Sequence, residues 1–265
     1  MKKYFKLAQC ALAVLVAFTS CNSDEVISQN DEVQLQPQEF LNITYKGEVY
    51  KNIPTTYDEN GDFVFWDNIF SNIYEKELKE NTNLSIVARD PQNIILYEDF
   101  QTACDSEGII LIKEIPNIEA SYNTLNSRAG YEDLASVTLY DDRDFKDRNY
   151  TFVLNDTVKA TEVVDLKKSP WKFNDKCSSL ILTNNLPNDP NKKLMLGSYE
   201  YACTDIDVVF IGYDDKGFTD RTITCIAPTA QVKKYASLPG FNDKMSSFKP
   251  VSYTHLRAHE TRSNL

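Results

Sequence analysis

Short stretches of alternating apolar and polar residues begin near residue 40, and such alternation is typical of β-strands. Leu41–Tyr45 and Glu48–Tyr50 alternate around Lys46-Gly47, which predicts a β-hairpin. After a turn at 58–61, apolar residues recur every three or four positions. This spacing predicts an amphipathic helix whose core-facing stripe is Trp66, Ile69, Phe70, Ile73, Tyr74 and Leu78.

Residues 84–89, 93–97 and 109–113 are predicted as short strands. Together with the hairpin and the helix, they indicate a small α+β domain of unknown role over residues 40–120. Residues 121–134 are mostly polar and are predicted as a linker.

The first 21 residues have the pattern of a secretory signal, in which three lysines precede an apolar run that is too short to span a bilayer. Phe18-Thr19-Ser20-Cys21 resembles a bacterial lipobox, which implies cleavage before Cys21 and acylation of its thiol. Residues 22–39 are polar and acidic and predict a flexible tether. Asn22–Glu25 resembles an export tag for the outer membrane of Gram-negative bacteria, which implies a lipid-anchored protein at the cell surface. The alternative is a plain signal peptide in which Cys21 occurs by chance.

The opposite end of the chain has a different character. Val251–Thr261 is VSYTHLRAHET, which resembles the translation of a transposase-type sequencing adapter. We therefore leave residues 251–265 out of functional reasoning and expect the genuine C-terminus to be missing. Both histidines of the chain, His255 and His259, fall in this segment, so their spacing is not interpreted as a zinc motif.

Without both ends, the net charge changes from −11 to −15 and no histidine remains. Such an acidic chain is not expected to bind nucleic acid, because that requires a basic face. The absence of imidazole disfavours Ser-His and Cys-His catalysis and most catalytic zinc sites. Cys203 and Cys225 could form a disulfide in an exported protein, which the sequence leaves open.

Residues 135–250 contain one pattern twice. Tyr140–Arg148 is similar to Tyr213–Arg221 at an offset of 73, and Phe173–Ser179 is similar to Phe241–Ser247 at an offset of 68. Each copy is predicted as two strands around a turn, an irregular segment, and a last strand. Short strands with long connections favour Greek keys, here a first key at about 135–183 and a second key at about 206–250. We call Asn174–Ser179 the first clamp and Asn242–Ser247 the second clamp.

This tandem pattern resembles the βγ-crystallin domain, a sandwich of two Greek keys. The resemblance rests on the two clamps and on the aromatic pairs Tyr140 with Phe145 and Tyr213 with Phe218. It departs from the family at Asp147 and Asp220, where glycine is usual, although Asp tolerates the left-handed backbone that the folded hairpin needs. The expected fold is mainly β, with a βγ-crystallin-like double Greek-key sandwich after the small α+β domain.

The resemblance implies two Ca²⁺ sites, each shared between the clamps. One ion would take Asp175, the carbonyl of Lys176, and Ser246; the other would take Asp243, the carbonyl of Lys244, and Ser178; Asn174 and Asn242 would give support. Oxygen ligands of this kind suit Ca²⁺. The resemblance also implies that Ser179 and Ser247 fasten the hairpins to the sheet. Cys177 and Met245, at an alternating position, are predicted to face the core. The alternative is that the clamps are ordinary Asx turns that bind nothing.

The predicted function is a non-catalytic, calcium-binding surface lipoprotein that contacts the membrane through the lipid on Cys21. The alternative is a surface adhesin that binds an extracellular protein or glycan and uses the sandwich as a scaffold. An enzyme would have to rely on carboxylates alone. Adjacent pairs such as Asp141-Asp142 indicate solvated surface more than a catalytic pair.

Overall fold

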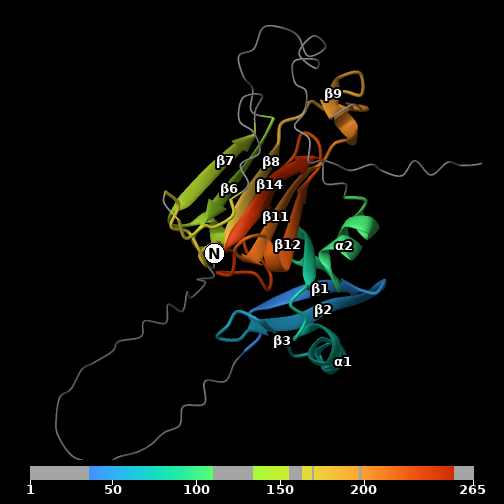
Figure 1. Ribbon diagram of the computed structural model, residues 1–265. Helices are drawn as coiled ribbons and strands as arrows, with labels where there is room; N and C mark the ends of the chain where they lie inside the picture. Colours follow the sequence, from blue (N-terminus) through green and yellow to red (C-terminus); the bar gives the residue numbers. More distant parts are fainter. Residues whose placement is uncertain (1–35, 110–133, 155–162, 169, 197–198, 254–265) are drawn as a thin grey trace, which may run out of the picture. The chain divides into compact units, whose positions relative to one another are not determined.

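A computed structural model describes residues 36–109, 134–154, 163–168, 170–196 and 199–253 of the chain (Figure 1). All of these residues belong to one compact unit, Gln36–Leu265. The predicted signal peptide with Cys21, nearly all of the predicted tether and linker, and both histidines lie outside the described residues. In the part of the chain that the structure describes, no helix is long and apolar enough to cross a bilayer.

The two repeats form Greek keys, and each pairs part of its backbone with the sheet of the other. In the first key β6 pairs with β7 and β8, and in the second key β11 pairs with β12 and β14. The third strand of the second key, β13, pairs with β8 of the first key, and Val163 of the first key forms a bridge with Phe248 in β14. The bounds are β6 Ala135–Tyr140, β7 Asn149–Leu154, β8 Ser179–Asn184, β11 Val208–Asp215, β12 Thr219–Ala227, β13 Val232–Tyr235 and β14 Ser247–Tyr253. This exchange makes a double Greek-key sandwich and confirms the predicted fold class.

Aromatic side chains fill the space between the two sheets. The ring of Phe248 in β14 lies 4.7 Å from that of Phe152 in β7 and 5.4 Å from that of Phe210 in β11, between centroids. Phe210 and Phe248 are fully buried. The last three residues of β14, 251–253, belong to the segment that resembles adapter sequence, and they pair through backbone groups that any residue supplies.

The region before the keys extends the second-key sheet instead of forming a sheet of its own. The eight strands run in the order β14-β11-β12-β4-β5-β1-β2-β3, and β12 pairs with β4 in parallel from Thr222–Ser85 to Cys225–Ala88. The additional bounds are β1 Glu39–Tyr45, β2 Glu48–Tyr57, β3 Phe63–Phe65, β4 Ser85–Asp90 and β5 Asn93–Tyr97. The structure therefore joins residues 39–97 and the second key in one sheet, although the sequence pattern treats the region before the keys as a separate domain.

Buried polar contacts support this junction. The Thr222 hydroxyl donates to the Ser85 hydroxyl at 2.8 Å, and both side chains are buried. The hydroxyl of Tyr235 in β13 lies 3.2 Å from the carbonyl oxygen of Ala88 in β4. Because buried hydroxyls are costly to leave without partners, these contacts favour this one arrangement of the strands.

The predicted helix is present, but its stripe is narrower than expected. Asp67 caps α1 (Asn68–Ile73) by accepting from the amide of Phe70, and a π-helical turn, Tyr74–Leu78, continues it. Phe70, Tyr74 and Leu78 are buried as predicted. Trp66 and Ile69 are 45% and 68% exposed, so their placement in the core was wrong. Trp66 precedes the cap, and Ile69 lies outside the face that Phe70 and Tyr74 define at spacing four.

Several elements have no counterpart in the sequence prediction. These are β3, α2 (Phe100–Glu107), β13, and the antiparallel pair β9 (Lys193–Leu196) and β10 (Tyr199–Ala202). In α2 only Ala103, Cys104 and Glu107 are buried, so the helix carries a weak apolar repeat. The strand predicted at 109–113 lies outside the described residues except for Ile109, which follows α2.

Gly240 offers a test of the junction between the two regions. It has a φ of +67°, and a Cβ there would lie 2.3 Å from Cε2 of Phe63. We expect Gly240→Ala to lower the free energy of unfolding by about 3 kcal/mol, because a strained backbone and a clash add together. Gly47 has a φ of +81° with nothing within 4 Å of the added Cβ, so Gly47→Ala should cost only about 1 kcal/mol. Equal losses in urea unfolding would contradict the packing of Phe63 against Gly240.

Candidate metal centre

The two clamps lie against each other, and each contributes to both predicted sites. The Ser178 hydroxyl donates to Asp243 Oδ1 at 2.6 Å, and the Ser246 hydroxyl donates to Asp175 Oδ1 at 3.0 Å. The backbone repeats this exchange, because the Asp175 amide donates to the Met245 carbonyl and the Asp243 amide donates to the Cys177 carbonyl, at 3.1 and 3.2 Å. The structure therefore brings together the serine and aspartate that the resemblance implied for each site.

The backbone at both aspartates is left-handed, with φ of +52° at Asp175 and +56° at Asp243. This region is unfavourable for most residues, although Asp is among those that tolerate it. Both side chains are solvent-exposed in the described structure. Each clamp thus turns sharply and leaves a carboxylate at the surface beside a hydroxyl from the other clamp.

The second serine of each clamp fastens a folded hairpin, as the resemblance implied. Ser179 Oγ donates to the Asp142 carbonyl at 2.6 Å and accepts from the Phe145 amide at 3.1 Å. In the second key, Ser247 Oγ donates to the Asp215 carbonyl and accepts from the Phe218 amide at the same two distances. Ser179 and Ser247 are fully buried, so each hydroxyl satisfies two backbone groups away from bulk water.

The residues that replace glycine behave as predicted. Asp147 and Asp220 have φ of +61° and +68°, in the left-handed region. The aromatic pairs of the hairpins are in contact, with ring centroids 5.7 Å apart for Tyr140 and Phe145. The corresponding pair in the second key is 5.5 Å apart. The hairpins are therefore two copies of one local structure.

The clamp cysteine and methionine both face the core. Cys177 and Met245 are fully buried, which confirms the prediction. Burial raises the pKa of the Cys177 thiol far above its usual value, so the thiol stays protonated and unreactive. Cys203 and Cys225 are buried free thiols in this structure, so the disulfide that the sequence left open is not formed.

The two leading asparagines differ in their partners. Asn174 Nδ2 donates to Asp175 Oδ2 at 2.5 Å, so it supports a clamp carboxylate directly. Asn242 Oδ1 instead accepts from the Leu238 amide at 3.0 Å, and its Nδ2 is buried without a hydrogen-bond partner. Asn242 therefore shapes the turn before the second clamp.

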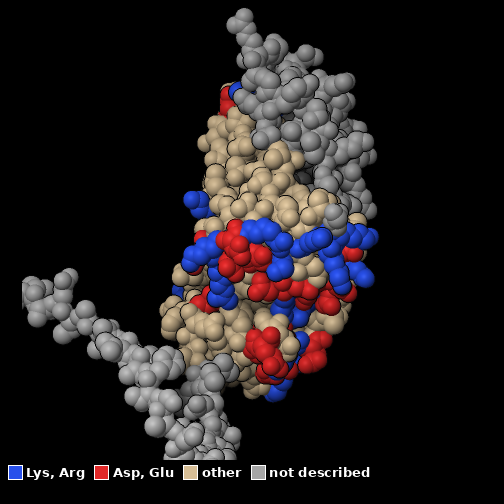
Figure 2. Space-filling view, turned by 90° about the vertical axis from the view of Figure 1, so that its left-hand side faces the viewer, with Lys and Arg blue, Asp and Glu red and all other residues tan. Residues whose placement is uncertain are grey.

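Charged side chains surround the second clamp. Asp62 Oδ1, in the turn between β2 and β3, accepts from Lys244 Nζ at 2.5 Å and from Arg221 Nη1 at 2.6 Å, and Arg221 also lies 3.2 Å from Asp214. Burial works to raise the pKa of Asp62, but the two cations outweigh it and hold that pKa below its usual value. Burial raises the pKa of Asp214. On the face shown in Figure 2, acidic and basic side chains alternate in a belt, so that face has no broad basic patch.

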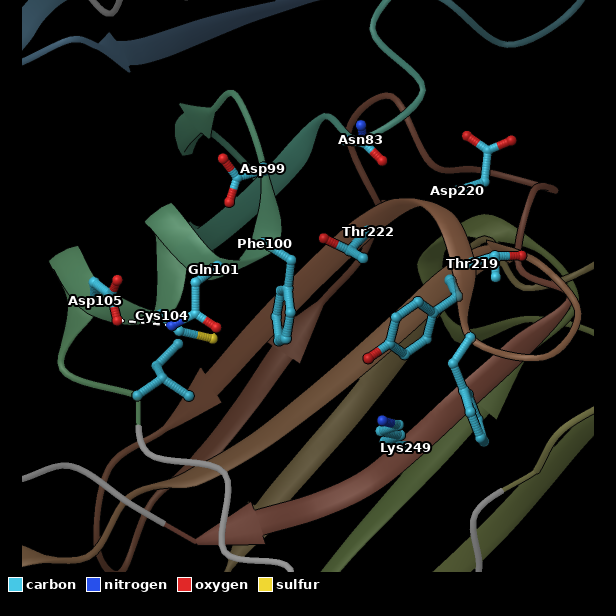
Figure 3. A pocket seen from close by; sticks show the side chains of 13 residues that line it. Asn83, Asp99, Phe100, Gln101, Cys104, Asp105, Thr219, Asp220, Thr222 and Lys249 are labelled. Carbon is cyan, nitrogen blue, oxygen red and sulfur yellow. Dashed lines mark hydrogen bonds between the residues drawn. The ribbon is translucent and has the colours of Figure 1, made fainter.

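A pocket of about 910 Å³ lies between α2 and the second key. In Figure 3 the ring of Phe100 projects from α2 over the strands, with Lys249 of β14 below it. Lys249 Nζ lies 4.8 Å from the ring centroid of Phe218 and 5.8 Å from that of Tyr213, so a sugar stacking on these faces would first displace the lysine.

The acidic groups of the pocket already have structural partners. Asp99 caps α2 through the amide and hydroxyl of Thr102, and Asp105 accepts from Gln101 at 2.8 Å. Burial raises the pKa of the Cys104 thiol to about 11, which disfavours a nucleophilic role. We therefore take the clamps as the candidate site.

Within the described ranges, no three His, Cys, Asp or Glu side chains are grouped to hold a metal. A site at the clamps would instead combine one carboxylate with a hydroxyl, a backbone carbonyl and water. This donor set is composed of oxygen alone, which fits a hard cation with a variable coordination number and does not fit zinc.

Two solved structures are among those similar to part of this chain. No protein-family model matches the chain, and no curated protein matches it. A βγ-crystallin from Ciona intestinalis is similar in structure, with 20% identity over 43% of this chain and 98% of its own, and a TM-score of 0.27. A βγ-crystallin from an archaeon has 14% identity over 44% of this chain and 96% of its own, with a TM-score of 0.26. We base the βγ-crystallin-like fold on the strand exchange, the hairpins and the clamps described above.

Neighbouring serines of one clamp allow a test of these assignments without metal. Ser179→Ala and Ser247→Ala should each lower the free energy of unfolding by about 2 kcal/mol in EDTA, because each change leaves two buried backbone groups without a partner. Ser178→Ala removes one bond to an exposed carboxylate and should cost less than about 1 kcal/mol. Equal losses for Ser178→Ala and Ser179→Ala in urea unfolding would contradict the distinction between the two positions.

Proposed function

We propose that the clamps bind two Ca²⁺ ions, which stabilise a non-catalytic, lipid-anchored surface protein. The observation that carries the proposal is the reciprocal pairing of Ser178 with Asp243 and of Ser246 with Asp175. A turn that binds nothing requires no serine from a clamp about 70 residues away. The same oxygens that now share a hydrogen bond are of the type that Ca²⁺ takes as ligands.

The chain's own residues would hold each ion as follows. Asp175 with the carbonyl of Lys176 and Ser246 would hold one ion, and Asp243 with the carbonyl of Lys244 and Ser178 would hold the other. Bound calcium would supply two positive charges between the keys at each site. Because each ion takes ligands from both clamps, binding would stabilise the folded arrangement of the two keys over the separated one.

The location of the protein is proposed from sequence. The lipobox-like Phe18–Cys21 supports acylation of Cys21, and the acidic residues after it support export to the outer leaflet of the outer membrane. Extracellular calcium modules commonly bind with dissociation constants of up to millimolar, which suits a surface protein that meets abundant free calcium.

Calcium titration of the mature chain tests the proposal. We expect isothermal titration calorimetry to give two equivalents of Ca²⁺, and one equivalent for either Asp175→Ala or Asp243→Ala. Calcium at a hundred times its dissociation constant should add about 2.7 kcal/mol per site to the free energy of unfolding. Asp105→Ala in α2 is the control and should keep both equivalents. An unchanged melting temperature and no binding heat in the parent protein would mean that the clamps are only turns.

The serine pair gives a second and independent test. Because Ser178 belongs to a site and Ser179 to a hairpin, Ser178→Ala should weaken calcium binding about tenfold, while Ser179→Ala leaves the affinity within about twofold of the parent protein. Affinities are measured only for variants that circular dichroism shows to be folded. A larger loss for Ser179→Ala would contradict the assignment of ligands.

A further inference from the structure

The two clamps are alike in sequence but differ in what surrounds their lysines. In the first key, Lys176 Nζ lies 3.7 Å from Asp141 Oδ1, and the side chain is 46% exposed. Arg148 lies 3.5 Å from the other oxygen of the same carboxylate. Among the described residues of the first key, two cations thus lie beside one carboxylate, and all three groups come from the repeat itself.

The second key receives an additional carboxylate from outside the repeat. Its equivalent cations, Lys244 and Arg221, both donate to Asp62 Oδ1, and Arg221 also pairs with Asp214, the counterpart of Asp141. The Lys244 side chain is only 7% exposed. Two cations therefore share two carboxylates, and the added one belongs to the turn between β2 and β3.

That turn is held by internal hydrogen bonds and lies against the second clamp. Asp58 Oδ1 accepts from the amides of Asn60 and Asp62, at 2.8 and 2.9 Å. A Cβ at Gly61 would lie 3.1 Å from Lys244 Cε and 3.5 Å from the Asn242 carbonyl oxygen. Asp62 is thus presented to Lys244 from a fixed backbone.

These contacts affect the binding of a cation at the second clamp in two ways, and both increase its affinity. Asp62 offsets the positive charge of Lys244 and Arg221, which would otherwise repel an incoming Ca²⁺. It also holds the Lys244 side chain in place, so less freedom is lost when the carbonyl of the same residue becomes a ligand. Lys176 is more exposed, and its nearest carboxylate is 3.7 Å away.

We propose that Asp62 is a positioning residue for the second site, and that it makes the site of Asp243, Lys244 and Ser178 the tighter of the two. This inference rests on the proposed calcium function. It also couples the region 39–109 to the metal. If docking of the turn increases the calcium affinity of the second site, bound calcium must stabilise docking of the turn by the same free energy.

Single-site backgrounds separate the two affinities in the mature chain. Asp175→Ala leaves the second site, and Asp243→Ala leaves the first. Adding Asp62→Asn should raise the calcium dissociation constant about tenfold in the Asp175→Ala background and less than about twofold in the Asp243→Ala background. The matched control is Asp141→Asn, which should act only on the first site. Replacing Lys244 by Met together with Asp62→Asn should restore most of the affinity, which a purely structural role for Asp62 would not predict.

Hydrogen exchange tests the coupling between the turn and the second site without any substitution of Asp62. Saturating calcium should slow exchange of the amides of residues 58–62 in the Asp175→Ala background and leave them unchanged in the Asp243→Ala background. If both backgrounds bind calcium but Asp62→Asn weakens them equally or not at all, the inference is overturned while the proposed function stands. If neither background nor the parent protein binds calcium, both are overturned.

Discussion

The exchange between the two Greek keys is the constraint on which the rest of this structure depends. The second key lends β13 to the sheet of the first key, and the first key contacts the sheet of the second key through the bridge from Val163 to Phe248 in β14. The clamps lie against each other, and this arrangement places Ser178 beside Asp243 and Ser246 beside Asp175. Each of these two serine–aspartate pairs needs one residue from each clamp, so a ligand that bound both members of a pair would stabilise the association of the keys.

The second key also supports residues 39–97, which precede the repeats. Its strand β12 pairs on one side with β11 of its own key and on the other with β4, so one backbone ladder continues into residues 39–97. The side chain of Asp62 then reaches back to the second clamp. The region that shares the sheet of the second key therefore also contacts the candidate metal centre. The two clamp lysines differ as a result, because Lys244 contacts Asp62 from outside the repeat and Lys176 contacts Asp141 from within it.

Local features could be predicted where both copies of the repeat place a residue of the same character at the equivalent position. Asp147 and Asp220 both take the left-handed backbone that glycine usually supplies, and Cys177 and Met245 both face the core. The failures came where a pattern was weak or a neighbour was distant. Trp66 fits the helical spacing but precedes the N-cap, and α2 buries too few apolar side chains to show a periodic signal.

The two keys, their hairpins and the composition of the clamps could be read from the amino-acid sequence, because a repeated motif specifies local conformation. The pairing of Asp175 with Ser246 and of Asp243 with Ser178 was only implied by the family resemblance, and the structure gives the hydrogen bonds. The three-dimensional arrangement alone reveals that residues 39–97 share the sheet of the second key, that Asp62 contacts Lys244, and that Cys203 and Cys225 are free thiols. The physical reason is that pairing between β4 and β12 joins residues about 137 positions apart. Such contacts depend on shape and charge complementarity between surfaces, which no local pattern of residues records.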